Sequence, residues 1–180
     1  MRIDEFNALD ASAARSVVSV WADIPEWVDA LVAERPYADT DELASRAAAL
    51  AQGWGPDELD TALAHHPRIG EKPAGSGAEA AASRSEQATM ATADDDVVAR
   101  IAAGNRAYED RFGRVFLIRA AGRTPGEMLA ELDRRLTHDD ETEAAEAAAQ
   151  LAEIALLRLR GAVDRAPTGV AAGQRTGAPS

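Results

Sequence analysis

Two adjacent histidines, His65 and His66, lie immediately before a proline in the segment HHPRIGEKPAGSG. Pro67 disfavours helical geometry at the residue before it and restricts its own backbone, so the imidazole of His66 is expected to project from a constrained loop. An imidazole titrates near neutral pH and therefore suits proton transfer. Taken alone, the dipeptide more often marks a loop histidine without a chemical role. A metal site is not expected, because adjacent rings do not easily converge on one ion and the third histidine, His138, is far away in the sequence.

A second polar set lies in the run Ser83-Arg84-Ser85-Glu86-Gln87. If this run is helical, Ser83, Glu86 and Gln87 share one face, because positions i, i+3 and i+4 lie on the same side of a helix. A hydroxyl, a carboxylate and an amide would then line up to hold a polar, nitrogen-rich ligand, and a desolvated Glu86 would supply a second acid or base. The same run is also typical of an ordinary solvated face, and the pattern alone favours that interpretation.

Near the end of the chain, Arg158 continues an apolar stripe. Ala147, Leu151, Ile154 and Arg158 follow one another at steps of 4, 3 and 4, which places the arginine in line with the apolar residues. One interpretation has the aliphatic stem covering the core while the guanidinium reaches water. The other has the guanidinium binding a carbonyl or carboxylate in a pocket.

The segment Ile118-Arg119-Ala120-Ala121-Gly122 combines small residues with an apolar start. Outside a helix, its backbone N–H and C=O groups need partners, and its small side chains would let a planar ligand lie close. Ordinary turn formation explains the glycine equally well.

The elements that must position these residues are predicted to be helical. In the clearest case, Val97, Ile101, Asn105, Tyr108 and Phe112 recur at steps of 4, 4, 3 and 4, and Gly113 follows as a terminator. Capping residues, prolines and glycines delimit the others, including a capping box with a proline at Thr124-Pro125-Gly126-Glu127. We expect helices over 12–21, 25–33, 40–52, 56–64, 78–90, 94–112, 125–136 and 139–160.

The segment VFLIRAAG, residues 115–122, is β-branched and apolar in places but has no evident partner strand, so we expect an extended connector. The whole sequence predicts an all-α fold: a single-domain bundle of about seven to nine helices with a long irregular active-site loop. We expect the domain to span residues 1–162 and residues 163–180, which have few large apolar side chains, to form a disordered tail.

Composition argues against several classes of function. The chain has 31 acidic and 19 basic residues, a formal net charge of −12, so nucleic acid is not an expected partner. It has no cysteine, which excludes disulfides, thiolate metal sites and a cysteine nucleophile. No stretch has the length and apolarity of a membrane span, and the acidic start MRIDEF is unlike a signal peptide. Together with the lack of an S-K-L address at the end, these features predict a cytoplasmic protein.

Four segments taken together resemble one known family in order and spacing: HHPRIGEK, the S-x-x-E-Q run, FGRVFLIRAAGRT and EIALLRLR. The sequence is similar to 2-oxo-4-hydroxy-4-carboxy-5-ureidoimidazoline (OHCU) decarboxylases over roughly Phe6 to Leu159. This resemblance implies an all-helical homodimer that removes CO2 from a ureidoimidazoline acid in urate catabolism, a branch of purine breakdown, and delivers (S)-allantoin. It implies that no cofactor takes part and that the substrate is the hydrolysis product of 5-hydroxyisourate, which leaves functional coupling to a hydroxyisourate hydrolase open.

The resemblance also implies roles for individual residues. His66 and Glu86 match the catalytic positions. The positions expected to bind substrate are Pro67, Ser83, Gln87, Ile118, Arg119, Ala120, Ala121, Gly122 and Arg158. Two alternatives stay open: a helical protein-interaction module in which His66 is incidental, and the same fold acting on another ureido or imidazolone acid.

Overall fold

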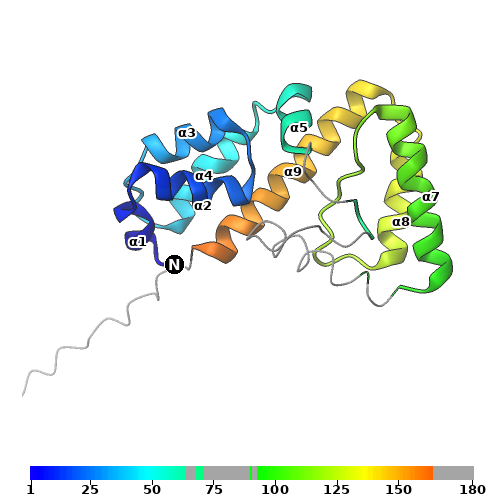
Figure 1. Cartoon of the computed structure of the whole chain (residues 1–180), viewed down its shortest axis with the longest axis horizontal. Coiled ribbons are helices and arrows are strands. Elements are labelled where there is room, and N and C mark those ends of the chain that lie inside the picture. Colours follow the sequence, from blue (N-terminus) through cyan, green and yellow to red (C-terminus); the bar gives the residue numbers. More distant parts are fainter. Residues whose placement is uncertain (64–67, 71–89, 91–92, 164–180) are drawn as a thin grey trace, which may run out of the picture.

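The computed structural model describes residues 1–63, 68–70, 90 and 93–163, and within these residues it contains eight α-helices and no β-strand (Figure 1). The predicted all-α class is therefore confirmed. The helix predicted over 78–90 lies outside the described residues except for Met90, and so does the predicted tail. The helices are α1 (Ile3–Ala8), α2 (Ala11–Trp21), α3 (Pro25–Ala33), α4 (Thr40–Ala51), α5 (Pro56–Leu63), α7 (Asp95–Phe112), α8 (Pro125–Arg135) and α9 (Asp140–Ala162).

Short polar side chains fix the beginnings of several helices, as the sequence predicted. The Asp10 carboxylate accepts the backbone N–H of Ala13 at 2.8 Å, which satisfies one of the free donors at the start of α2. Thr124 and Glu127 form the predicted reciprocal capping box at the start of α8. At the other end of a helix, Gly113 follows α7 with a φ of 68°, a left-handed conformation that favours glycine.

The first helix, α1, was not predicted, because six residues are too short to display a helical period. Its position depends on tertiary packing, since Ile3 and Phe6 are buried. The Phe6 ring lies 5.7 Å from the ring of Trp21, centroid to centroid. A short helix of this kind is held by the core that it covers rather than by its own propensity.

The helices α1 to α5 surround one hydrophobic cluster, here called the α1–α5 core, to which the C-terminal half of α9 contributes. Its side chains are almost entirely aliphatic or aromatic, and the indole N–H of Trp27 is satisfied by the Ala47 carbonyl at 3.0 Å. The largest fully buried members are Phe6, Trp21, Ile24, Leu31, Leu43, Leu59 and Leu159.

A second cluster, here called the α7–α8 core, lies between α7, α8 and the connector that joins them, residues 114–124. Its fully buried members include Ile101, Tyr108, Met128 and Leu132. Ile69 and Met90 also belong to it, so the chain on both sides of the segment 71–89 meets this core. Figure 1 shows α9 as one long helix that starts beside α7 and α8 and ends beside α1 and α2, so that it joins the two cores.

Candidate active site

Five of the predicted site residues lie outside the described part of the chain. The others lie on the connector and on α9. The residues outside the described ranges are His66, Pro67, Ser83, Glu86 and Gln87.

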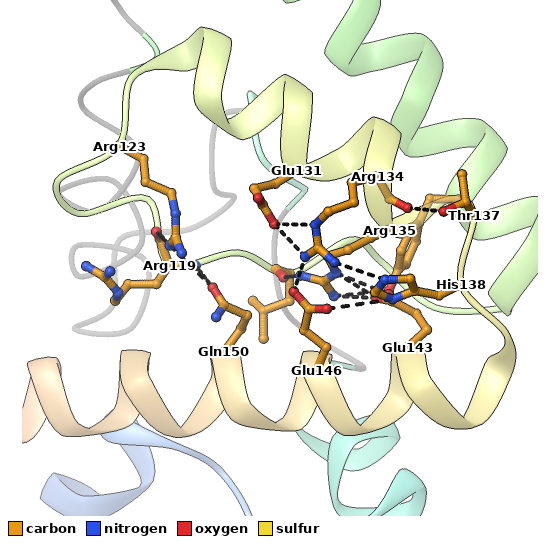
Figure 2. A network of polar contacts seen from close by, with 12 residues as sticks. Arg119, Arg123, Glu131, Arg134, Arg135, Thr137, His138, Glu143, Glu146 and Gln150 are labelled. Carbon is orange, nitrogen blue, oxygen red and sulfur yellow. Dashed lines mark hydrogen bonds and ion pairs between the residues drawn. The ribbon is translucent and has the colours of Figure 1, made fainter.

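The connector has no regular secondary structure over residues 115–120 and carries Ile118 and Ala120 buried against the α7–α8 core. No strand among the described residues pairs with it, and side chains of α9 supply some of its hydrogen bonds instead. The backbone N–H of Arg119 donates to the Gln150 side-chain oxygen at 3.0 Å, as Figure 2 shows. The turn then closes with the N–H of Arg123 donating to the Ala120 carbonyl at 3.0 Å.

The Arg119 side chain is held on both sides. Its Nε donates to the Glu153 carboxylate on α9 at 2.6 Å, and a second guanidinium nitrogen donates to the Ala121 carbonyl at 2.6 Å. The next residue, Gly122, has a φ of 80°, so the connector turns towards α8 in a conformation that L side chains rarely adopt. The predicted segment 118–122 is therefore a bent stretch of backbone next to α9, and side chains of α9 hold it in place.

Arg158 lies in the part of α9 that contacts the α1–α5 core. Its guanidinium donates to the backbone carbonyl of Val20, on α2, at 3.0 Å, and the side chain is partly buried. Binding a carbonyl was one of the two interpretations of the apolar-stripe arginine, and here the carbonyl belongs to the protein itself. The contact ties α9 to α2.

The first described residues after His66 are Arg68, Ile69 and Gly70, and they contact α7. Arg68 forms a two-pronged ion pair with Glu109, with one N···O distance of 2.8 Å and a second, shorter contact through its Nε. This ion pair holds the pKa of the Glu109 carboxyl below its usual range. The Ile69 side chain is buried, and its carbonyl accepts the Asn105 amide N–H at 3.0 Å.

A buried charge cluster, formed by Arg135, Glu143 and Tyr108, lies where α7, α8 and α9 meet (Figure 2). The side chains of Arg135 and Glu143 are only 1% and 0% exposed, so the pair is almost fully removed from water. Arg135 also donates to the Leu117 carbonyl of the connector at 2.7 Å and lies 4.7 Å above the Phe116 ring. Burial, followed by the hydrogen bond to Glu143, raises the pKa of the Tyr108 hydroxyl far above its usual range.

His138 closes this cluster at its outer side. Its Nε2 lies 2.9 Å from a guanidinium nitrogen of Arg134, which can only donate, so Nε2 must accept and Nδ1 must carry the proton. Nδ1 then donates to Glu143 at 3.1 Å. His138, Glu143 and Glu146 bring three ligand atoms within 4.8 Å of one another. Each carboxylate is already paired with an arginine, Glu143 with Arg135 and Glu146 with Arg134, so the cluster is explained as an ion-pair network.

The sequence contained a signal for this cluster that the predictions missed. Glu143 precedes Ala147 by four residues, so it lies on the same stripe that ends at Arg158, and Arg135 follows Leu132 by three on the apolar face of α8. A charge at a position that helical periodicity assigns to the core needs a buried partner. Two such charges of opposite sign, eight residues apart across a short turn, would have predicted this pair.

Known proteins share both the sequence and this architecture. The family model described as OHCU decarboxylase matches residues 7–160. The chain belongs to the OHCU decarboxylase family. Its relatives include the 2-oxo-4-hydroxy-4-carboxy-5-ureidoimidazoline decarboxylase of Haloferax volcanii, which is 27% identical over 88% of this chain and 94% of the relative.

Solved structures agree with the family assignment. The crystal structure of an OHCU decarboxylase in the presence of (S)-allantoin superposes with a TM-score of 0.69 at 27% identity, covering 80% of this chain and 94% of that one. A crystal structure of (S)-allantoin synthase shares the fold with a TM-score of 0.67 at 20% identity, over 91% of this chain and 55% of that one.

Membership of the OHCU decarboxylase family confirms the predicted class of enzyme, a carboxy-lyase of urate degradation. It favours catalysis over the interaction module that the sequence left open. In the part of the chain that the structure describes, no helix is long and apolar enough to cross a membrane.

Proposed function

We propose that His66 and Glu86 carry out the proton transfers of a cofactor-free decarboxylation of OHCU to (S)-allantoin. The observation that supports this proposal is the family match over residues 7–160, an interval that contains both residues within their quoted motifs. The solved relative at 27% identity was crystallised in the presence of (S)-allantoin, which is the product expected here.

The chemistry needs no external electron acceptor. When the bond between C4 and the carboxylate breaks, CO2 leaves and the electron pair moves towards C5 and the neighbouring ring imine nitrogen, which takes up a proton. The resulting C4–C5 double bond carries the 4-hydroxyl, whose proton is then lost as C5 gains one. The protein therefore has to orient the carboxylate and place one proton donor on one face of C5.

In this scheme His66 contacts the 4-hydroxyl or the carboxylate and promotes C–C cleavage. Glu86, acting with His66, controls the proton that reaches C5. The two roles are exchangeable on chemical grounds, because an imidazole and a carboxyl group can each act as acid or base near neutral pH when their pKa values are tuned.

The remaining family positions bind the substrate. Ser83 and Gln87 supply a hydroxyl and an amide, and Pro67 restricts the backbone next to His66. Arg158 faces the ureido group in addition to its contact with the Val20 carbonyl. The connector, Ile118 to Gly122, presents backbone to the ligand. Its support fits this role, because Gln150 and Arg135 brace the connector backbone from α9 and α8.

The proposal extends to the setting of the enzyme. We infer a cytoplasmic homodimer that takes its substrate from a hydroxyisourate hydrolase. Because OHCU also loses CO2 unaided and then yields racemic allantoin, the contribution of the enzyme is stereochemical as well as kinetic.

The test is circular dichroism of urate turned over by urate oxidase and hydroxyisourate hydrolase, with this chain added, omitted or replaced by His66→Ala. We expect rapid formation of (S)-allantoin only in the sample that contains the intact chain. His66→Ala should retain the far-ultraviolet spectrum of the folded protein while losing stereoselective turnover. Racemic product at the unassisted rate in every sample would contradict OHCU as substrate and favour another ureido or imidazolone acid.

A further inference from the structure

The segment Arg68-Ile69-Gly70 contacts α7 through a charged side chain, an apolar side chain and a backbone carbonyl. The Arg68 guanidinium pairs with Glu109, the Ile69 side chain lies in the α7–α8 core, and the Ile69 carbonyl accepts from Asn105. Gly70 adds a φ of 85°, a conformation that fixes where the chain turns. Asn105 and Glu109, which lie one helical turn apart on α7, thus hold the backbone that follows His66-Pro67.

The Asn105 contact is unusual for its surroundings. Asn105 is 3% exposed and lies on the apolar stripe of α7 between Ile101 and Tyr108, where a leucine would pack without any unsatisfied polar atom. Its side-chain oxygen has no hydrogen-bond partner among the described residues. Among the described residues, the one hydrogen bond of this side chain is the donation to the Ile69 carbonyl, so the amide holds a segment of backbone that a leucine could not hold.

The Glu109 contact has directional geometry. Two guanidinium nitrogens of Arg68 meet the two carboxylate oxygens, and this fork restricts rotation as well as distance. Glu109 is 24% exposed and Arg68 43% exposed, so the pair contributes little to stability but still sets a direction for residue 68.

We propose that Asn105 and Glu109 are positioning residues for His66. The inference rests on the proposed catalytic role of His66. Arg68 and Ile69 are the second and third residues after His66. Pro67, which lies between His66 and Arg68, has a restricted backbone, so an anchor at residues 68–69 limits where the His66 imidazole can point. Displacing a reacting group by about 1 Å can lower a rate by about a hundredfold, which makes such anchors matter for turnover more than for folding.

The experiment compares Asn105→Leu and Glu109→Gln with a matched control, Asp110→Asn, which removes the same charge from an exposed position next to Glu109 on α7. We expect kcat for (S)-allantoin formation to fall between about tenfold and a hundredfold in the two anchor variants, with KM changed less than about twofold. The share of racemic product should rise with the loss of kcat. Asp110→Asn should behave as the wild type.

An exchange of the two charges of the ion pair separates an effect on catalysis from an effect on folding. Arg68→Glu and Glu109→Arg should each lower kcat, and the double variant should recover a large part of the loss, because the ion pair is restored with its ends reversed. The inference is overturned if the anchor variants retain the wild-type kcat, or if kcat per folded molecule stays constant while only the melting temperature falls. If His66→Ala itself turns over like the wild type, the proposed function fails, whereas full activity of the anchor variants beside an inactive His66→Ala refutes the positioning role alone.

Discussion

The two hydrophobic cores differ in what they bury besides apolar side chains. Among the described residues, the α1–α5 core buries the polar groups of Trp27 and Tyr37 and, at its edge, Thr40, but no charge. Asn105, Gln150 and the charged pair Arg135 and Glu143 are instead buried around the α7–α8 core and the α9 face beside it. Burying an ion pair seldom stabilises a protein relative to well-packed apolar residues, whereas breaking it is costly. The α1–α5 core is thus organised mainly by apolar packing, whereas the α7–α8 core also contains buried charged and amide groups whose contacts have defined directions.

The contacts around the second core explain this difference. Arg135 donates to the Leu117 carbonyl and Gln150 accepts from the Arg119 N–H, so buried side chains hold the connector where strand partners would otherwise be needed. Asn105 holds the Ile69 carbonyl in the same way. The polar groups are buried where irregular backbone must keep one conformation, and both such segments lie next to predicted site residues.

The largest effect is expected from breaking the buried ion pair. Glu143→Ala leaves the Arg135 guanidinium buried without its partner, so the free energy of unfolding should fall by about 3–5 kcal/mol in urea denaturation. The matched control is Asp133→Ala, which removes the exposed ion pair with Arg100, whose side chains are 57% and 56% exposed, and should cost less than about 1 kcal/mol. If the two variants lost a similar amount of free energy of unfolding, the buried ion pair would not distinguish the region around the α7–α8 core.

A cavity in the other core should have a comparable but separable effect. Leu43 is fully buried in the α1–α5 core, so Leu43→Ala should lower the free energy of unfolding by about 2–5 kcal/mol. Because Leu43 lies in the α1–α5 core and Glu143 in the charge cluster beside the α7–α8 core, the loss in the double variant should equal the sum of the single losses within about 0.5 kcal/mol. A marked departure from the sum, measured by the same denaturation, would show that the cores are energetically coupled.

A smaller effect is expected where α7 and α8 approach each other. A methyl group at Gly104 would lie 2.5 Å from the Leu132 Cδ2, and Leu132 is itself fully buried. Gly104→Ala should therefore lower the free energy of unfolding by about 1–3 kcal/mol despite the better helix propensity of alanine. At Gly126, in the first turn of α8, a methyl group would meet nothing within 4 Å, so Gly126→Ala should leave stability unchanged or raise it slightly. Equal melting temperatures for both variants would contradict the close contact.

The smallest effect concerns pH. Arg68 holds the pKa of Glu109 below its usual range, so the charged carboxylate stabilises the folded state above the unfolded pKa of about 4.3. This contribution, at most about 1 kcal/mol for a partly exposed pair, should disappear as the pH falls through the lowered folded pKa. The stability difference between the wild type and Glu109→Gln should therefore be present at pH 7 and vanish in strong acid. A difference that is independent of pH would rule out the ion pair as its source.

Much of the fold could be predicted because local signals determine it. Asp10, Pro25 and the Thr124 capping box mark helix starts that the structure reproduces, and the stripe from Val97 to Phe112 corresponds to α7. The missed α1 depends on tertiary contacts of Ile3 and Phe6, which no local pattern reveals.

The contacts that hold the site in place could not be predicted in this way, because they join residues that are far apart in the sequence. Arg68 meets Glu109 across 41 positions, and Arg119 meets Gln150 across 31. Periodicity could still have identified Asn105, Arg135 and Glu143 as polar residues at core positions, although not their partners. The family resemblance supplied the catalytic positions that spacing alone left open.

The most direct test of the proposed active site is a crystal structure of the chain with (S)-allantoin bound. We expect the allantoin to lie between the His66 imidazole, the Glu86 carboxylate and the backbone of residues 118–122, next to the α7–α8 core. Allantoin bound elsewhere on the chain, with His66 and Glu86 out of contact, would contradict this expectation.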